Sequence, residues 1–302
     1  MNVALIGYGE VGRILGEDLR AAGQTVTAFD LKLDSAEGEA LRAHARAHGV
    51  TLAGSHAEAV RSAELVICAV TASQTIAAAD ACALALPAGS FFLDFNSASP
   101  GAKTAAAGMV ARGAGRYVEG AVMTAVPPYR IKVPLLLGGP DAAALVPQLA
   151  DLGFSAKLVS GRLGVASATK MCRSVIIKGL EAMTVESLTA ARHYGVEDAV
   201  LASLRETFPG IDWEKQAVYF FQRVIEHGRR RGEELIEAAV TVEQAGVPPG
   251  SAVGTAERQT WVADLADDGI FGERGSPRFA RTDDWRVEAD RILDHLHRPQ
   301  ER

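Results

Sequence analysis

Three glycines, Gly7, Gly9 and Gly12, follow the first apolar run of the chain in the segment VALIGYGEVGRIL. The spacing fits G-x-G-x-x-G, which is a weak signal alone because glycine-rich turns are common. Here a strand-like run precedes the glycines and a helical pattern follows them. In that context the first glycine permits a tight turn, the second lets the backbone approach a pyrophosphate, and the third lets helix and strand pack closely. The unpaired N–H groups of the helix N-terminus favour phosphate. The segment predicts a dinucleotide-binding loop, with an ordinary turn as the alternative.

An acidic residue, Asp30, ends the next strand-like run, TVTAFD. A carboxylate at this place accepts hydrogen bonds from the ribose hydroxyls of NAD and repels the 2′-phosphate of NADP. No arginine that would bind this phosphate follows within the next several residues, but Lys32 does. The residues favour NAD as the cofactor, with NADP as the alternative. The residues expected to bind the cofactor are Gly7, Tyr8, Gly9, Glu10, Val11, Gly12, Asp30, Val70 and Thr71.

A second group of polar residues lies in the segment GRLGVASATKMCRSVIIKGL, residues 161–180. Lys170 interrupts an apolar helical pattern, and Arg173 and Ser174 share its helix face because they follow it by three and four positions. Lys178 lies one turn further along. The pattern predicts a helix with one apolar face and one polar face. Lys170 is suited to proton transfer and Arg173 to pairing with a carboxylate. Exposed helix side chains without a chemical role are the alternative. Arg130 and Lys132 are weaker candidates for the carboxylate, and a solvated loop is the alternative for them.

The two halves of the chain have different patterns. In the first half, short apolar runs alternate with alanine-rich helical segments, which is typical of βαβ units with a parallel sheet covered on both faces. After Gly161 only long helical patterns follow. The sequence predicts an α/β Rossmann domain with a mostly parallel, doubly wound sheet over residues 1–160, and an all-α domain over residues 161–302. The expected strands are residues 3–6, 25–30, 63–70, 89–95, 116–123, 132–139 and 156–160, and the expected long helices are residues 163–194, 213–245, 252–267 and 285–295.

These segments resemble the β-hydroxyacid dehydrogenase family, which includes 3-hydroxyisobutyrate dehydrogenase and 6-phosphogluconate dehydrogenase. The catalytic pattern of that family, G-x-x-G-x-G-x-x-x-K-x-x-N-N, is matched at Gly161, Gly164 and Lys170. The chain departs from it where Arg173 and Ser174 replace the two asparagines and where alanine replaces the third glycine. The resemblance also covers the N-terminal glycine fingerprint, the length, and the change to helices near residue 160.

Two further segments are similar to substrate loops of the family. DFNSASP, residues 94–100, is similar to the D-x-S-T-x-S-P loop beside the nicotinamide, with Asn96 and Ser97 in place of Ser-Thr. EGAVMTA, residues 119–125, takes the place of the substrate-binding D-A-P-V-S-G-G, and Thr124 replaces one of its small residues. The resemblance implies that the substrate-binding residues are Asn96, Ser97, Thr124, Arg173 and Ser174.

The resemblance implies an NAD(P)-dependent oxidoreductase that interconverts a hydroxy acid and its oxo acid or semialdehyde, with Lys170 as the general acid and base. The expected substrate is a small molecule that bears a carboxylate, and the expected assembly is a homodimer formed through the helical domain. Two alternatives remain. One is an imine or ketone reductase of the sister branch, whose members usually replace the residue at Lys170. The other is a dinucleotide-binding protein without turnover, which the altered substrate loops motivate.

The composition of the chain bears on which classes of partner it can bind. The chain has 302 residues, of which 48% are apolar and 23% charged, with a net charge of −6. It has no long basic tract, so we expect no nucleic-acid partner. The cysteines Cys68, Cys82 and Cys172 are expected to be buried, reduced thiols. The longest apolar stretch, residues 65–79, is too short to span a bilayer, and no signal-peptide pattern is found. We expect a cytoplasmic protein with no membrane association.

One histidine pair has metal-ligand spacing. His44 and His48, in the segment HARAH, lie four positions apart on a predicted helix. Nearby sequence offers no cysteine, aspartate or third histidine to complete a ligand set. We therefore expect a solvated helix face and no metal site.

Overall fold

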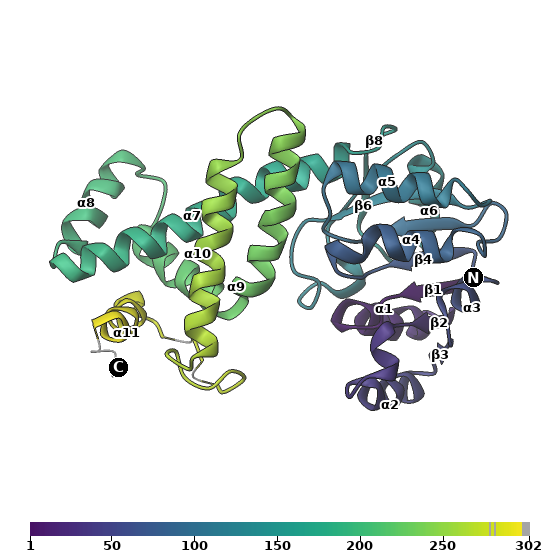
Figure 1. Cartoon of the computed structure of the whole chain (residues 1–302), viewed down its shortest axis with the longest axis horizontal. Coiled ribbons are helices and arrows are strands. Elements are labelled where there is room, and N and C mark those ends of the chain that lie inside the picture. The colour runs from purple at the N-terminus through teal and green to yellow at the C-terminus, as the bar shows by residue number, and fades with distance from the viewer. Residues whose placement is uncertain (278, 281, 298–302) are drawn as a thin grey trace. The chain divides into compact units, whose positions relative to one another are not determined.

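The computed structural model describes residues 1–277, 279–280 and 282–297, and divides into two compact units, Met1–Met171 and Cys172–Arg302 (Figure 1). The first unit contains a sheet with helices, and the described residues of the second contain helices and no strand. The predicted order of an α/β part and an all-α part is confirmed. Helix α7 (Val165–Tyr194) begins in the first unit and continues in the second. The division into a cofactor domain and a substrate domain at residue 160 stays a prediction.

The sheet of the first unit has the strand order β3-β2-β1-β4-β5-β6-β7-β8. All neighbouring strands are parallel except β6 and β7, which are antiparallel. The order reverses between β1 and β4, which is the point where ligands bind in open α/β sheets. The strands are β1 (Asn2–Ile6), β2 (Thr25–Phe29), β3 (Thr51–Leu52), β4 (Leu65–Cys68), β5 (Phe91–Asp94), β6 (Arg116–Val122), β7 (Leu135–Gly138) and β8 (Ala156–Ser160).

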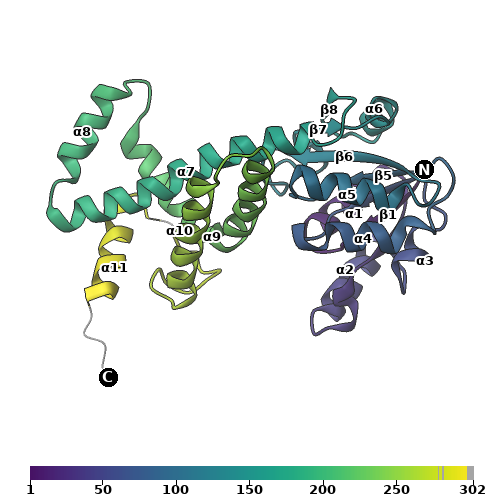
Figure 2. The ribbon, with the colours of Figure 1, turned by 45° about the horizontal axis from the view of Figure 1, so that its top comes forward.

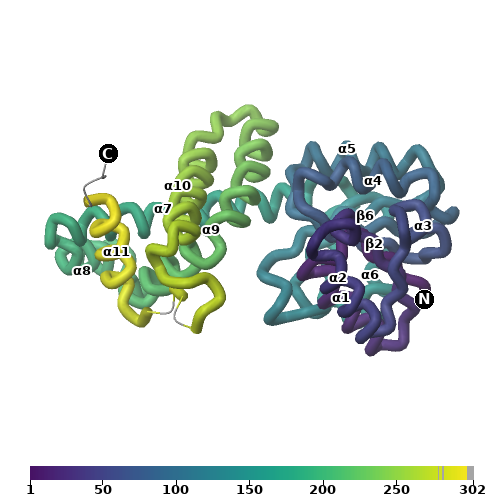
Figure 3. The backbone as a smooth tube through the Cα atoms, turned by 60° about the horizontal axis from the view of Figure 1, so that its bottom comes forward, coloured from purple at the N-terminus to yellow at the C-terminus, as the bar shows by residue number. Residues whose placement is uncertain are grey.

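Helices cover both faces of this sheet, and the first strand shows why its residues are apolar throughout. Val3 and Leu5 belong to the core that also contains α1 and α6, whereas Ala4 and Ile6 belong to the core that contains α4 and α5. Alternate residues therefore enter opposite cores. Figure 3 shows α4 and α5 side by side. The helices are α1 (Glu10–Ala21), α2 (Gly38–His48), α3 (His56–Val60), α4 (Thr75–Ala83), α5 (Pro100–Val110) and α6 (Ala142–Asp151), with the short 3-10 turns η1 (Leu31–Asp34), η2 (Ala72–Gln74) and η3 (Arg130–Lys132).

The second unit is built on the antiparallel pair α9 and α10, which lie side by side in Figure 2. Glycines allow this close contact, since a Cβ atom at Gly228 would lie 2.5 Å from the backbone oxygen of Gln259. Trp285 and Phe221 are buried in the core of this unit. Besides α7, its helices are α8 (Glu197–Thr207), α9 (Trp213–Gln244), α10 (Gly250–Asp267) and α11 (Trp285–His297).

The predicted faces of α7 are wrong in the second unit. Ile176, on the predicted apolar face, is 66% exposed, whereas Lys178, on the predicted polar face, is 4% exposed. The reason is a set of buried ion pairs that face α9. The Lys178 ammonium lies 2.5 Å from the Glu234 carboxylate, and Glu181 pairs with Arg231. These pairs turn the polar side of the helix toward α9, and the Glu234 carboxylate balances the positive charge of Lys178.

The remaining expectations are mostly confirmed. Each expected strand and long helix is present, with ends within a few residues of those predicted. The structure adds β3 and α8, and Gly195, at φ +68°, lies just after the end of α7. Cys68 and Cys82 are buried as expected, but Cys172 is exposed, because it lies on the outward side of α7. Among the described residues, no helix combines the length and the apolar character that crossing a membrane requires.

Candidate functional site

The glycine loop has the geometry that its spacing predicts. Gly7 has φ +92°, and a Cβ atom there would lie 2.4 Å from the backbone oxygen of Ala69. At Gly12 a Cβ atom would lie 2.1 Å from the backbone oxygen of Gly7. Both positions therefore require glycine, one for the turn and one for the contact between helix and loop. At Gly9 a Cβ atom would meet nothing within 4 Å, so the space beside this residue is open.

The N-terminus of α1 offers donors to a phosphate. Gly9 is the N-cap residue and no side chain caps this end, while the exposed Glu10 and the half-buried Val11 begin the helix. The N–H groups of the first helical turn have no partner within the helix, and the helix dipole adds a partial positive charge. An open approach at Gly9 and an uncapped helix end together fit a dinucleotide pyrophosphate.

Asp30 joins this loop to the end of β2. Its Oδ2 accepts a hydrogen bond of 2.6 Å from the Tyr8 amide, and its Oδ1 accepts one of 2.8 Å from the Lys32 amide. Each carboxylate oxygen retains further acceptor capacity, which ribose hydroxyls can use. The side chain of Lys32 turns to Glu37, with a nitrogen–oxygen distance of 2.9 Å. Asp30 therefore fixes the glycine loop and presents a negative charge beside it.

The Asn96 side chain connects the loop after β4 with the loop after β5. Its side-chain oxygen accepts a hydrogen bond of 2.7 Å from the Val70 amide, and its side-chain nitrogen lies 3.5 Å from the sulfur of Cys68. Asn96 is 3% exposed. Its side chain holds the loop after β4, which contains Val70 and Thr71, against the loop after β5. This bracing role was not predicted, and a direct contact of Asn96 with substrate stays a prediction.

A buried ion pair anchors the loop after β5. The Lys103 ammonium, on α5, lies 2.8 Å from Asp94 Oδ1 and donates to the backbone oxygens of Asp94 and Gly120. The Tyr117 hydroxyl donates to Asp94 Oδ2 at 2.7 Å. Burial, followed by the nearby Asp94 charge, raises the pKa of Tyr117 well above its usual value. This anchor was not predicted: the sequence shows a lysine in an alanine-rich helical segment, but neither its burial nor its partner follows from spacing.

Lys170 meets Ser97 within the first unit. The Lys170 ammonium donates a hydrogen bond of 2.5 Å to the Ser97 hydroxyl, and both residues are half-buried. This contact brings the predicted catalytic lysine to the loop that begins after β5. The carboxyl ends of β1, β2, β4 and β5 share one edge of the sheet because these strands are parallel. The glycine loop, Asp30, Val70 and Ser97 therefore follow strands that end at the same edge.

Glu119 holds the helix that carries Lys170, and sequence reasoning missed this role. Glu119, on β6, is fully buried. Its carboxylate accepts hydrogen bonds of 2.7 Å from the Gly164 amide and 2.5 Å from the Ser167 amide. It thereby caps the N-terminus of α7 from a strand, one helical turn before Lys170. The sequence shows the glutamate in the place of the aspartate of the family loop, which is the only signal for it.

The remaining predicted residues do not join the contact between Lys170 and Ser97 through hydrogen bonds or ion pairs described above. Thr124 is exposed on the loop after β6. Arg173 and Ser174 follow Lys170 on α7 within the second unit, where Arg173 is exposed and Ser174 is buried. Arg130, the weaker candidate for a substrate carboxylate, pairs instead with Glu17 and Asp18 of α1, at 2.6 and 2.7 Å.

Comparison with known proteins supports the family. A family model described as "NADP oxidoreductase coenzyme F420-dependent" matches residues 2–96, and one described as "Domain of unknown function (DUF1932)" matches residues 191–262. The chain is 37% identical to a conserved hypothetical protein from Sinorhizobium meliloti 1021, with 96% of each chain covered and a TM-score of 0.77. It is 27% identical to a conserved protein of unknown function described as structurally similar to 3-hydroxyacid dehydrogenases, with 88% of this chain and 99% of that chain covered and a TM-score of 0.70.

The chain belongs to the β-hydroxyacid dehydrogenase family. Two solved structures share its fold at lower identity. The 3-hydroxyisobutyrate dehydrogenase of Mycobacterium tuberculosis is 18% identical, with 96% and 98% coverage and a TM-score of 0.70. An imine reductase from Aspergillus terreus is 20% identical, with 87% and 94% coverage and a TM-score of 0.55. Family and fold together indicate an NAD(P)-dependent oxidoreductase of the hydroxyacid dehydrogenase type.

Proposed function

We propose that this β-hydroxyacid dehydrogenase interconverts a hydroxy acid and its oxo acid or semialdehyde, with Lys170 as the general acid and base. The observation that carries the proposal is the hydrogen bond from the Lys170 ammonium to the Ser97 hydroxyl. It places the only lysine that matches the family motif at the loop after β5, at the sheet edge where the glycine loop also lies.

The proton steps follow from this pair. In the direction of oxidation, neutral Lys170 takes the proton of the substrate hydroxyl while the bond from carbon to hydrogen breaks with both electrons. A nicotinamide cofactor, which the glycine loop and Asp30 would hold, would supply the hydride acceptor for this step and the hydride donor for its reverse. In the direction of reduction, the Lys170 ammonium gives its proton to the carbonyl oxygen of the substrate. Ser97 holds the ammonium and can donate its own hydroxyl proton to the same substrate oxygen, so it orients the proton transfer.

We infer that the cofactor is NAD. Asp30 supports this choice because its charge lies at the end of β2 beside the glycine loop and would repel a 2′-phosphate. Lys32, which could attract that phosphate, is engaged with Glu37. In the test, Asp30→Ala raises the affinity for NADP relative to NAD, measured by fluorescence titration. An unchanged affinity ratio would remove Asp30 from the ribose site.

Arg173 is the proposed partner of the substrate carboxylate, as a bidentate donor, because it is exposed and follows Lys170 on the same helix. Thr124, Ser174 and Asn96 are proposed to shape the remainder of the site. For Asn96 the proposal is a contact through its neighbour Ser97, since the amide itself braces the loops.

The test is nicotinamide absorbance change over a panel of 2-hydroxy acids, 3-hydroxy acids, oxo acids and cyclic imines, with NAD and with NADP. We expect turnover of a hydroxy acid that falls by about 10²- to 10⁴-fold in Lys170→Ala, which is the usual contribution of positioned proton transfer. Lys157→Ala is the matched control because this lysine is exposed on β8. Turnover equal in Lys170→Ala and Lys157→Ala would refute the role of Lys170.

Two other outcomes correspond to the alternatives. Turnover of cyclic imines that is insensitive to Lys170→Ala would place the chain with the imine reductases. Binding of NAD without turnover of any panel member would identify a dinucleotide-binding protein.

We also propose a homodimer formed through the helical unit. In its favour, Ile176 and Met183 on α7 are 66% and 60% exposed, which leaves apolar surface for a second copy to cover. A monomer in light scattering at micromolar concentration would overturn this expectation.

A further inference from the structure

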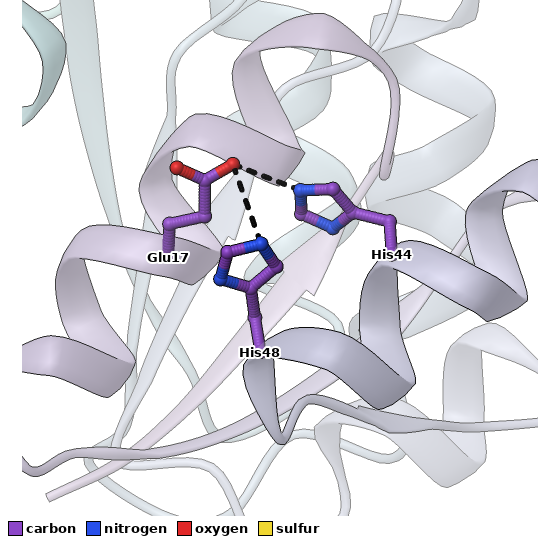
Figure 4. Close-up of side chains that lie close together, drawn as sticks. All are labelled: Glu17, His44 and His48. Carbon is purple, nitrogen blue, oxygen red and sulfur yellow. Dashed lines mark hydrogen bonds and ion pairs between the residues drawn. The ribbon is translucent and has the colours of Figure 1, made fainter.

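Three side chains of types that commonly bind metals, Glu17, His44 and His48, meet between α1 and α2, beside Tyr8 of the glycine loop (Figure 4). His44 Nε2 lies 2.9 Å from Oε1 of Glu17, and His48 Nε2 lies 4.0 Å from the same oxygen. The two rings stack with centroids 4.5 Å apart. Their four-residue spacing on α2 places both rings on one helix face, and α1 supplies the carboxylate that the local sequence lacked. The prediction of a solvated helix face therefore does not hold for His44, whose side chain is largely covered and forms hydrogen bonds.

The distances suit a small divalent cation. The three ligand atoms lie within 4.8 Å of one another. A tetrahedral zinc ion with bonds of about 2.0–2.1 Å requires its ligand atoms to be roughly 3.3 Å apart. The two separations from Glu17 Oε1, 2.9 and 4.0 Å, lie on either side of that value. The His48 side chain is 41% exposed and can rotate to shorten the longer of these separations.

Each of the two better-buried ligands has an outer partner. The Tyr8 hydroxyl lies 3.0 Å from Nδ1 of His44, so the ring can donate Nδ1–H to Tyr8 and present the lone pair of Nε2 to a metal. Arg130 donates to Oε2 of Glu17 at 2.6 Å, which leaves Oε1 for the metal. Arg130 also brings a positive charge, and Asp18, 2.7 Å from the same guanidinium nitrogen, offsets it.

We propose that Glu17, His44 and His48 bind one divalent transition-metal ion of the zinc type, with water in the remaining coordination positions. Two imidazoles and one carboxylate suit zinc, cobalt or nickel, whereas calcium and magnesium require more oxygen ligands. The site is partly open to solvent, which gives the ion a path of entry. Because Tyr8 lies between Gly7 and Gly9, the bound ion would be tied to the glycine loop through His44.

The test measures zinc binding to the full chain after treatment with a chelator, by titration calorimetry, with the absorption spectrum of bound cobalt as an independent readout of histidine ligation. Cys172→Ser is the parent because this exposed thiol could bind zinc on its own. His193→Ala, outside the cluster, is the matched control.

We expect one equivalent of zinc, an affinity at least 100-fold lower in His48→Ala, and no change in His193→Ala. His48 is exposed near the end of α2, so its removal should not impair folding. Tyr8→Phe, which removes only the outer partner, should weaken binding about 10- to 100-fold. Absence of binding at about 100 µM zinc, which lies far above the dissociation constants of structural zinc sites, or binding unaffected by His48→Ala, would overturn the proposal.

Discussion

Replacement of Glu119 by glutamine should lower the free energy of local opening at the start of α7, while the side chain keeps its size. The carboxylate accepts the Gly164 and Ser167 amides at 2.7 and 2.5 Å inside a fully buried environment. A hydrogen bond to a charged group contributes about 1.5–3 kcal/mol, and a buried donor left without a partner costs about 1–3 kcal/mol. Glutamine keeps one acceptor oxygen but turns an NH2 group toward the other amide. We therefore expect a loss of about 2–4 kcal/mol for local opening of this helix end.

The assay must report on this helix end rather than on the whole chain. All three tryptophans, Trp213, Trp261 and Trp285, lie in the second unit, so their fluorescence does not follow the loss. Hydrogen exchange measured on a peptide that covers residues 161–171 reports directly on opening of this helix end. A change of 2–4 kcal/mol corresponds to exchange that is faster by about 30- to 1000-fold in the regime where exchange follows the opening equilibrium.

The matched control is Glu58→Gln. Glu58 also accepts a backbone hydrogen bond, from the Gly54 amide at 2.8 Å, but in an exposed position. Exchange over residues 161–171 should not change in this variant. Gly138→Ala is a second perturbation of the same cap, since a Cβ atom there would lie 2.8 Å from Oε2 of Glu119. If Glu119→Gln exchanges within threefold of the parent chain, the carboxylate does not hold α7, and the reasoning is wrong.

Two further perturbations test buried charges. Lys103→Met leaves the Asp94 carboxylate buried without its cation, so the free energy of unfolding of the sheet unit should fall by about 3–5 kcal/mol in urea denaturation, whereas Lys157→Met should change little. A decrease below about 1 kcal/mol would contradict the anchoring role. Burial, followed by the charge of Arg223, lowers the pKa of His227 to about 4. The unfolded chain therefore takes up a proton near pH 6.5, before the folded chain does, and stability should fall as pH drops from 6.5 to about 4. His227→Gln should flatten this slope and match the parent above pH 6.5, and equal slopes would show that His227 does not titrate in this window.

The fold was predictable because its strands are buried on both faces and therefore appear as continuous apolar runs, as in LVIC of β4. Strand β3 was missed because its two residues carry no pattern. Helix α8 was missed because it follows Gly195 after one residue and its sequence is rich in charged residues. The faces of α7 were predicted wrongly because helical periodicity assumes an apolar interior, whereas the second unit buries ion pairs such as Glu181 with Arg231.

The site was predictable only where its contacts are local. The glycine loop follows from the spacing of neighbouring residues, and Asp30 from its place at the end of the next apolar run, although its contact with Tyr8 is not local. Lys170 followed from the family motif. The contacts that hold these groups join residues far apart in the chain, such as Glu119 with Gly164 and His44 with Glu17. No periodicity encodes such pairs, because they depend on which elements the fold brings together.

The structure gives a common reason for several of these distant contacts. Asp94 and Glu119 are register partners on the neighbouring strands β5 and β6, and both are buried. Two carboxylates side by side away from water would be strongly destabilising unless each is compensated. Lys103 compensates the first from α5, and the N-terminus of α7 compensates the second through its amides. Burying the two carboxylates therefore requires α5 and α7 to stay in place, because these helices supply the compensating groups.

These fixed helices hold the two residues proposed for proton transfer. The loop after β5 is held by Asp94 and Asn96, and the start of α7 is held by Glu119, so Ser97 and Lys170 approach each other from two anchored elements. Preorganisation of this kind supports the proton transfer proposed for Lys170, whose geometry must not vary. Exposed side chains such as Thr124 and Arg173 lie outside this buried network. Substitutions there should alter substrate selectivity with little loss of stability, whereas substitutions at the buried carboxylates should lower both.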